Sequence, residues 1–201
     1  VMNPNTGEIY AMAQGYTFDG NNPSDPLALT TNPAFQSKWE AMTDEEKYNY
    51  LNTCWNNFNV SSSFEPGSIF KPMVVAACLE EGVITNNTTF NCTGSRSVGG
   101  WDIPCHLTSG HGIIDVEGVL AQSCNVGMMD MVAKLGAEKF YKYQKDFGVG
   151  ELTGIDLPGE ASFSNLMYDL EDIGSTELAT MSFGQSFTTT PIQVLNAFCA
   201  V

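Results

Sequence analysis

One segment of the sequence combines a tight turn with an apolar pattern at helical spacing. Phe64-Glu65-Pro66-Gly67 forms the turn, and apolar residues follow at positions 70, 73, 74, 77 and 78. Steps of three and four residues predict a helix with a broad buried face. Pro72 fits only in the first turn of a helix, so this helix should begin close to Ser68 and end at Gly82. The fold is therefore expected to be built around a buried helix that carries a serine at its N-terminal end.

Ser68 and Lys71 are spaced so that both side chains lie on one face of this helix. A serine hydroxyl is a weak nucleophile until a neighbouring base takes its proton. Lys71 can act as that base if burial and neighbouring cations lower its pKa. The backbone N–H groups at the start of the helix favour an oxyanion beside Ser68. A chain of this length contains about one Ser-x-x-Lys by chance, so the pair needs independent support.

Ser123-Cys124-Asn125 supplies this support, because it lies in a predicted corner between two helices. The first helix is predicted over 115–122 and the second over 126–135. Polar side chains at such a corner can project into a cleft, although by itself a corner of this kind is more typical of helix capping. The two motifs in this order favour a serine acyl-transfer site.

The rest of the chain alternates between strand, loop and helix signals. Residues 1–13 predict a hairpin around a turn rich in Asn, Pro and Gly. Residues 16–59 are rich in Asn, Pro, Asp and Thr and predict a surface excursion. Residues 85–112 are rich in Gly, Thr and Ser and are expected to be irregular. Capping patterns and apolar spacing predict further helices at 43–51, 138–147 and from 190 onward.

These motifs resemble the transpeptidase domain of class B penicillin-binding proteins, the cell-division and sporulation type. Ser-x-x-Lys followed by Ser-x-Asn belongs to the signature that penicillin-binding proteins share with class A β-lactamases. The resemblance implies a mixed α/β (α+β) fold of the β-lactamase/transpeptidase kind, with an antiparallel sheet flanked by helices and an all-helical subregion. It runs nearly end to end and is carried by residues 3–13, 64–72, 111–112, 123–125, 147–150, 153–160, 183–185 and 190–193.

The resemblance also implies a role for each matching residue. Ser68 would attack the penultimate D-alanine carbonyl of a peptidoglycan stem peptide and form an acyl-enzyme, with Lys71 as the base. Ser123 would relay a proton to the leaving group, and Asn125 would hold the amide backbone of the substrate. The amine of a neighbouring stem peptide would take the acyl group and complete the cross-link. β-Lactams would acylate the same serine, and no cofactor is implied for this chemistry.

The third motif of the family, Lys-Thr-Gly, is absent from the sequence. None of the seven lysines is followed by Thr-Gly or Ser-Gly, so residues 1–201 are interpreted as a partial transpeptidase domain that stops before the strand with this motif. No apolar run approaches the ~20 residues that span a bilayer. The resemblance implies a membrane anchor in a preceding segment, which would hold the domain at the outer face of the bacterial cytoplasmic membrane.

The charge of the chain restricts its partners. The sequence carries 23 acidic against 8 basic residues, a formal charge of −15. Such a surface repels nucleic acid and gives no attraction to anionic lipid headgroups. The family resemblance instead implies peptidoglycan stem peptides, β-lactam antibiotics and the division or sporulation machinery as partners.

Cysteine, histidine and aspartate residues gather around the Ser-x-Asn corner in the sequence. A tetrahedral zinc site needs four such ligands and accepts mixed Cys, His and Asp ligation. The preferred ligand set for a structural zinc is Asp102, Cys105, His111 and Cys124, with Cys92 and His106 as substitutes. The alternative is that the cysteines are buried, free or disulfide-bonded, because their spacing matches no familiar zinc finger or ribbon.

Two other functions stay open at this point. A serine β-lactamase shares the nucleophile and the lysine but must also activate a water, and the sequence shows no clear deacylating base. A non-catalytic sensor module on the same fold would be acylated by β-lactams without turning over a stem peptide. The transpeptidase is favoured by the intact set of Ser68, Lys71, Ser123 and Asn125.

Overall fold

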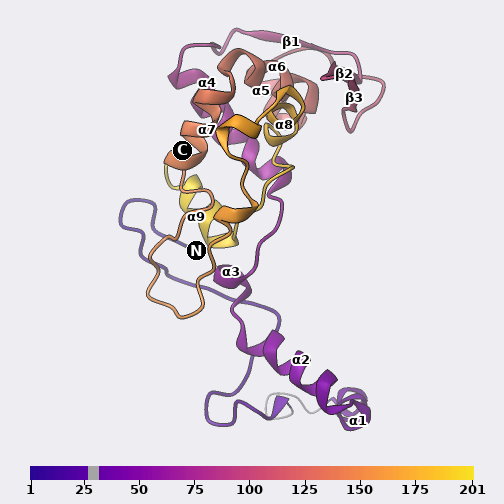
Figure 1. The fold of residues 1–201 in the computed structure, drawn as a ribbon, viewed down its shortest axis with the longest axis vertical. Helices are drawn as coiled ribbons and strands as arrows, with labels where there is room; N and C mark the ends of the chain where they lie inside the picture. The colour runs from indigo at the N-terminus through magenta and orange to yellow at the C-terminus, as the bar shows by residue number, and fades with distance from the viewer. Residues whose placement is uncertain (27–31) are drawn as a thin grey trace.

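The computed structural model describes residues 1–26 and 32–201. Figure 1 shows a helical body that contains α4 to α9, and a narrow arm that extends away from it and carries α1 and α2. The α-helices are α1 (Pro33–Ala41), α2 (Asp44–Trp55), α3 (Phe58–Ser61), α4 (Lys71–Glu80), α5 (Val116–Ala121), α6 (Asn125–Leu135), α7 (Ala137–Asp146), α8 (Ser175–Met181) and α9 (Pro191–Phe198). Short 3₁₀ turns are η2 (Gly67–Phe70), η3 (Ser164–Leu166) and η4 (Leu170–Asp172), and the strands are β1 (Thr89–Cys92), β2 (Ser95–Val98), β3 (Trp101–Pro104) and β4 (Gly112–Asp115).

The hydrophobic core of the body forms around α4, α6 and α8. Helix α6 packs against both of the others, so it is the central element. Its methionines at positions 128, 129 and 131 are buried, and α4 adds Met73, Val74 and Cys78 from the facing side. Burying such side chains is the main favourable term in folding. The predicted central helix behind Ser68 is therefore present, and it is packed on a second helix that begins at the Ser-x-Asn corner.

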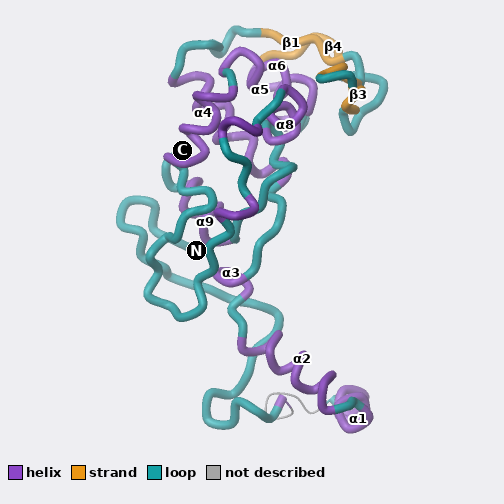
Figure 2. Tube along the Cα trace, viewed as in Figure 1, coloured by secondary structure: helices purple, strands orange, loops and turns teal. Residues whose placement is uncertain are grey.

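The described strands form two separate antiparallel pairs at one edge of the body (Figure 2). β1 pairs with β4, with Phe90 opposite Ile114, and β2 pairs with β3, with Arg96 opposite Ile103. The expectation that residues 85–112 are irregular is therefore wrong. Each of these strands has only four residues, so the alternation of apolar and polar residues that signals a strand is too short to be recognised in the sequence.

The prediction of a mixed α/β fold with antiparallel pairing and a helical subregion is confirmed. A single sheet between helical layers is absent from the part of the chain that the structure describes. The predicted hairpin over residues 1–13 is reduced there to one bridge between Met2 and Ile9. A bridge becomes a sheet only when a neighbouring strand continues its hydrogen-bond ladder, and no described strand does so.

Local signals set the helix ends as predicted. Thr43 and Glu46 form a capping box at α2, and Thr190 and Gln193 form another at α9. Pro72 lies in the first turn of α4, where its missing N–H costs no hydrogen bond. Three of the described helices were not predicted: α1 buries none of its side chains, α3 spans only four residues, and α8 spans only seven. Among the described residues no helix is both long and apolar enough to cross a bilayer.

The arm is held together by aromatic contacts rather than by a core. The ring of Tyr50 on α2 contacts the rings of Tyr16, Phe35 and Trp39. Within α1 and α2, only Cys54 is buried. The prediction that residues 16–59 extend over the surface holds for the described part of this segment. The candidate functional residues lie in the body.

We expect the body to lose stability when the core around α6 is opened. Met131 is 0% exposed, so Met131→Ala removes buried methylenes and leaves a cavity. The free energy of unfolding in urea should fall by about 2–5 kcal/mol. Leu152→Ala is the control, because Leu152 is 58% exposed, and it should change this free energy by no more than about 0.5 kcal/mol. Equal effects of the two substitutions would contradict the assignment of α6 to the core.

Candidate active site

Ser68 lies in a 3₁₀ turn that leads directly into the central helix. Gly67 begins this turn with a φ of 59°, a left-handed conformation that glycine adopts without a Cβ penalty. Ser68 is exposed, whereas Lys71, the first residue of α4, is 1% exposed. One turn of chain therefore presents a serine hydroxyl to solvent and directs the lysine beside it into the body.

Ser123 lies in the corner between α5 and α6. Its φ is 49°, which is uncommon for a residue with a side chain and marks local backbone strain. The next residue, Cys124, is the N-cap of α6, and its Sγ accepts a hydrogen bond from the N–H of Gly127 at 3.3 Å. Cysteine thus takes the place of the usual capping hydroxyl or carboxylate at this position.

Hydrogen bonds join the two predicted motifs across the helix interface. The Lys71 Nζ donates to the Ser123 carbonyl oxygen at 2.6 Å, to the Ser123 Oγ at 2.9 Å and to the Asn125 Oδ1 at 2.8 Å. The Ser123 Oγ donates to the Ser68 Oγ at 2.9 Å. All four residues singled out in the sequence therefore lie in one network. The link from Lys71 to Ser68 runs through Ser123, which gives a path for a proton between the amine and the Ser68 hydroxyl.

The environment of Lys71 prepares it to release a proton. Burial lowers the pKa of Lys71 to about 8, while Cys105 and Cys124 act in the opposite direction. A buried ammonium is disfavoured because it loses its hydration, and this is the cause of the shift rather than a neighbouring cation. A group with a pKa close to ambient pH can accept and return protons in a catalytic cycle.

A cluster of thiols and one imidazole lies immediately behind the Ser-x-Asn corner. Each of its members offers one ligand atom, and these atoms all lie within 4.8 Å of one another. Three of the four side chains are fully buried. We call this group the thiol cluster, and it consists of Cys92, Cys105, His111 and Cys124.

The thiol cluster differs from the preferred ligand set of the sequence analysis in one member. Cys92, which was proposed as a substitute, occupies the fourth place, and Asp102 lies outside the group. Asp102 is exposed on β3 and faces Ser97 across the β2–β3 pair, so the strand pairing directs it away from the corner. His106 is also exposed and outside the group, with its ring 5.1 Å from that of His111. The spacing of residues along the chain could not reveal which side of a strand would face the cluster.

The cysteine that joins the thiol cluster to the active-site corner is Cys124. Burial raises the pKa of the Cys124 thiol to about 12, while the hydrogen bond from the Gly127 N–H acts in the opposite direction. Cys124 therefore stays protonated near neutral pH unless a cation is bound next to its sulfur.

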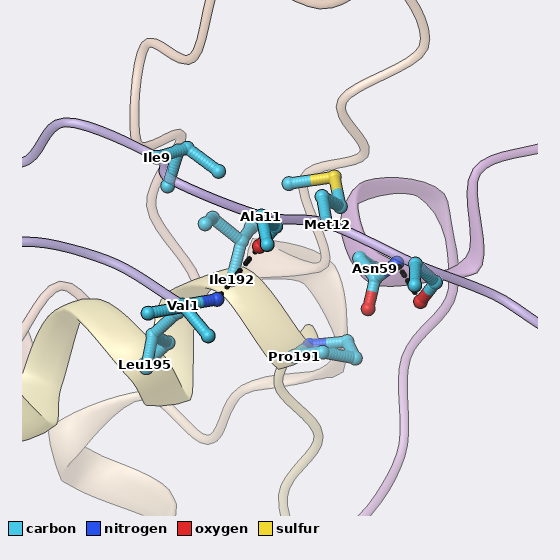
Figure 3. Close-up of a pocket in the computed structure, with 9 residues that line it drawn as sticks. Val1, Ile9, Ala11, Met12, Asn59, Pro191, Ile192 and Leu195 are labelled. Atoms are coloured by element: carbon cyan, nitrogen blue, oxygen red, sulfur yellow. Dashed lines mark hydrogen bonds between the residues drawn. The ribbon is translucent and has the colours of Figure 1, made fainter.

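The pocket in Figure 3 lies elsewhere in the body. It has a volume of about 320 Å³ and lies between the N-terminal segment and α9. None of its lining residues belongs to the network around Ser68, so we do not assign it to the serine chemistry. Those labelled in Figure 3 are Val1, Ile9, Ala11, Met12, Asn59, Pro191, Ile192 and Leu195.

Comparison with known families decides the relationship of this chain. The family described as the penicillin binding protein transpeptidase domain matches residues 1–201, the whole sequence. The chain belongs to this family. The resemblance predicted from the sequence motifs is thereby confirmed, and the network around Ser68 lies within a penicillin-binding transpeptidase domain.

Relatives of known sequence support the assignment to this family. The chain is 38% identical over 200 residues to stage V sporulation protein D of Bacillus subtilis, a match that covers 99% of this chain and 27% of the relative. It is 30% identical over 205 residues to the peptidoglycan D,D-transpeptidase FtsI of Escherichia coli, covering 98% of this chain and 29% of the relative. The chain thus spans less than a third of the length of either relative.

Solved structures show the same fold. The transpeptidase domain of penicillin-binding protein 3 from Burkholderia pseudomallei matches with a TM-score of 0.67 and 28% identity, over 72% of this chain and 43% of the other. Penicillin-binding protein 3 from Mycobacterium tuberculosis, in complex with aztreonam, matches with a TM-score of 0.66 and 30% identity, over 72% of this chain and 32% of the other. The mixed α/β architecture is therefore that of the penicillin-binding transpeptidase domains.

We expect the pKa of Lys71 to be directly measurable. In NMR spectra of protein with ¹³C-labelled lysine, the Cε signal of Lys71 should titrate with a midpoint close to pH 8, because burial disfavours its charged form. The signal is assigned by its loss in Lys71→Arg. A midpoint above about 10, in the ordinary range of a lysine, would show that the amine is hydrated and not poised as a base.

Proposed function

We propose that this protein is a peptidoglycan D,D-transpeptidase that cross-links stem peptides through an acyl-enzyme on Ser68. The observation that carries the proposal is the hydrogen-bonded series from Lys71 through Ser123 to Ser68. A nucleophile, a base with a lowered pKa and a hydroxyl between them are the groups that acyl transfer requires. Membership of the transpeptidase family and the naming of relatives as D,D-transpeptidases favour the same reaction.

In the proposed acylation, the Ser68 Oγ forms an ester bond with the penultimate D-alanine carbonyl carbon. The Ser68 proton moves toward Lys71 along the path through Ser123. The C–N bond to the terminal D-alanine then breaks, and Ser123 passes a proton to the departing amine. In the second half, the amine of another stem peptide attacks the ester, a new amide forms and Ser68 regains its proton. Asn125 accepts from Lys71 through its Oδ1, and its Nδ2 donates to the Pro104 carbonyl oxygen at 3.5 Å, so one N–H of the amide is left for the substrate backbone.

The proposed substrate indicates where the domain would act and what it would bind. Peptidoglycan lies outside the cytoplasmic membrane, so we infer that the domain acts on the outer face of that membrane. β-Lactams would react with Ser68 as substrate mimics. The similarity to a stage V sporulation protein and to FtsI points to the division or sporulation machinery as the partner assembly.

Intact mass after incubation with benzylpenicillin tests the proposed nucleophile. We expect the full-length protein to gain one penicillin, in a stable adduct that is absent from Ser68→Ala. Ser123→Ala should slow formation of the adduct by about 100-fold, since it removes the hydroxyl between amine and nucleophile. The exposed Ser109 supplies a control, because Ser109→Ala should react at the wild-type rate.

The outcomes of this experiment separate the proposed function from its alternatives. Rapid loss of the adduct with release of hydrolysed penicillin would identify a serine β-lactamase. A stable adduct without cross-linking of donor and acceptor stem peptides would identify a sensor module. An adduct that persists in Ser68→Ala would overturn the assignment of the nucleophile.

We further propose that the thiol cluster holds a structural zinc ion. Three cysteines and a histidine are a common structural ligand set, and in a tetrahedral site with Zn–S bonds of about 2.3 Å the sulfurs lie about 3.8 Å apart. The present separations of up to 4.8 Å need only a small contraction. The ion would join β1 and the loop before β4 to the N-cap of α6, and so hold the corner that carries Ser123. It has no part in the acyl-transfer chemistry.

Metal analysis of paired variants tests the ligand set. Protein purified with zinc present should contain one zinc per chain, and removing it should lower the melting temperature by about 5 °C or more. Cys92→Ser should lose the zinc, whereas Asp102→Asn should keep it, because Cys92 belongs to the thiol cluster and Asp102 does not. Zinc retained in Cys92→Ser, or a disulfide between two cluster cysteines in place of zinc, would contradict the proposal.

A further inference from the structure

The turn that presents Ser68 is held from behind by a segment far away in the sequence. Residues 183–189, which we call the backing segment, follow α8 and precede α9. The Phe64 and Thr189 backbones form an antiparallel bridge, with an N–H donated in each direction at 3.0 Å. On the other side of Ser68, the rings of Phe70 and Phe187 are in edge contact, with centroids 5.0 Å apart. The backing segment thus contacts the chain both before and after the nucleophile.

Gly184 makes the closest approach of the backing segment to the nucleophile. Its carbonyl oxygen accepts a hydrogen bond from the N–H of Gly67, the residue before Ser68, at 2.8 Å. A Cβ at position 184 would lie 2.1 Å from the Gly67 oxygen and 2.5 Å from its nitrogen. Both contacts are to backbone, so a side chain could fit only if the turn itself moved. Within the backing segment, Gly184 therefore has a specific role. Because it has no side chain, the peptide between Gly67 and Ser68 can lie directly against it.

Glu65 makes a second connection between the turn that carries Ser68 and the backing segment. Its Oε1 accepts a hydrogen bond from the backbone N–H of Ser186 at 2.9 Å. Ser186 has a φ of 65°, an unfavourable conformation for a residue with a side chain, and its Oγ also contacts the Thr180 Oγ1 at 2.8 Å. Strained backbone persists only where surrounding contacts determine it. The Glu65 carboxylate and Thr180 supply such contacts, and they fix the backing segment opposite the turn.

We propose that Gly184 and Glu65 are positioning residues for acylation, which hold Ser68 at hydrogen-bond distance from Ser123. Neither residue touches the reacting atoms; both act through the backbone of the nucleophile turn. The inference rests on the proposed function, since it assigns the two residues to the Ser68 reaction. Ser123 is fixed independently, by the corner between α5 and α6, so a shift of the turn changes the Ser68–Ser123 distance of 2.9 Å directly. Misplacement of reacting groups by about 1 Å costs on the order of 100-fold in rate.

A pair of glycine variants tests the role of Gly184. Gly184 and Gly159 have nearly equal φ values of 79° and 81°, but a Cβ at Gly159 meets nothing within 4 Å. Both Gly→Ala substitutions therefore introduce the same backbone strain, and only Gly184→Ala displaces the turn. We expect the rate of acylation by benzylpenicillin to fall about 10- to 100-fold in Gly184→Ala and to change less than about twofold in Gly159→Ala. Rates are compared at a temperature at which circular dichroism shows both variants folded.

Substitutions at Glu65 test the second connection by rescue. Glu65→Leu removes the acceptor for the Ser186 N–H and should lower the acylation rate by about tenfold. Glu65→Gln keeps an amide oxygen at the same place and should restore most of this rate. Equal rates in Glu65→Leu and wild type, or in Gly184→Ala and wild type, would overturn the inference.

A thiol probe separates failure of the inference from failure of the proposed function. In Ser68→Cys, alkylation of the introduced thiol by iodoacetamide is followed by peptide mass spectrometry, so the other cysteines do not interfere. A thiol at a helix N-terminus beside Lys71 should have a lowered pKa, and adding Gly184→Ala should move the midpoint of its alkylation upward by about one pH unit. This shift is expected even if penicillin acylates no form of the protein. A complete lack of acylation would refute the transpeptidase proposal but would leave the positioning role of Gly184 intact. An unchanged midpoint would refute the positioning role.

Discussion

The burial of the Lys71 amine constrains the rest of the site. An amine withdrawn from water must find hydrogen-bond acceptors within the protein, and Lys71 finds three of them on Ser123 and Asn125. These acceptors lie at the start of α6, whereas Lys71 begins α4. The packing of α4 on α6 therefore cannot slide without leaving a buried amine unsatisfied, and the same contacts that satisfy the amine place Ser123 against Ser68. Core packing and the contact between Ser123 and Ser68 are consequences of one arrangement.

The two sides of this arrangement are held by different parts of the chain. Behind the corner, Cys124 caps α6 and also belongs to the thiol cluster, which brings in Cys92 from β1 together with Cys105 and His111. Behind Ser68, the backing segment contacts the chain at Phe64, Gly67 and Phe70. Ser68 and Ser123 thus meet between two supports that share no residue. The strained residues lie at these supports, Ser123 next to Cys124 and Ser186 within the backing segment, as expected for backbone that surrounding structure holds in place.

Much of the fold could be predicted because its signals are local. The capping boxes at Thr43 and Thr190, the position of Pro72 and the apolar spacing of α4 and α6 each act within a few residues, so the helices could be placed correctly. The strands between positions 89 and 115 could not, because strands of four residues are too short to show a pattern and are stabilised mainly by their pairing. The same limit explains why Asp102 was preferred over Cys92: strand register decides which residue faces the thiol cluster.

The sequence by itself determined the candidate residues: a serine and a lysine one helical turn apart, a Ser-x-Asn corner, and cysteines and histidines near that corner. Residue type and helical periodicity are enough for this, since both are properties of short segments. Only the tertiary structure decided that Ser68 meets a serine 55 positions away, that Lys71 is buried, and that Gly184 lies against the peptide before Ser68. These relations join residues distant along the chain, and they are fixed by the packing of α4, α6 and the backing segment, which no local pattern records.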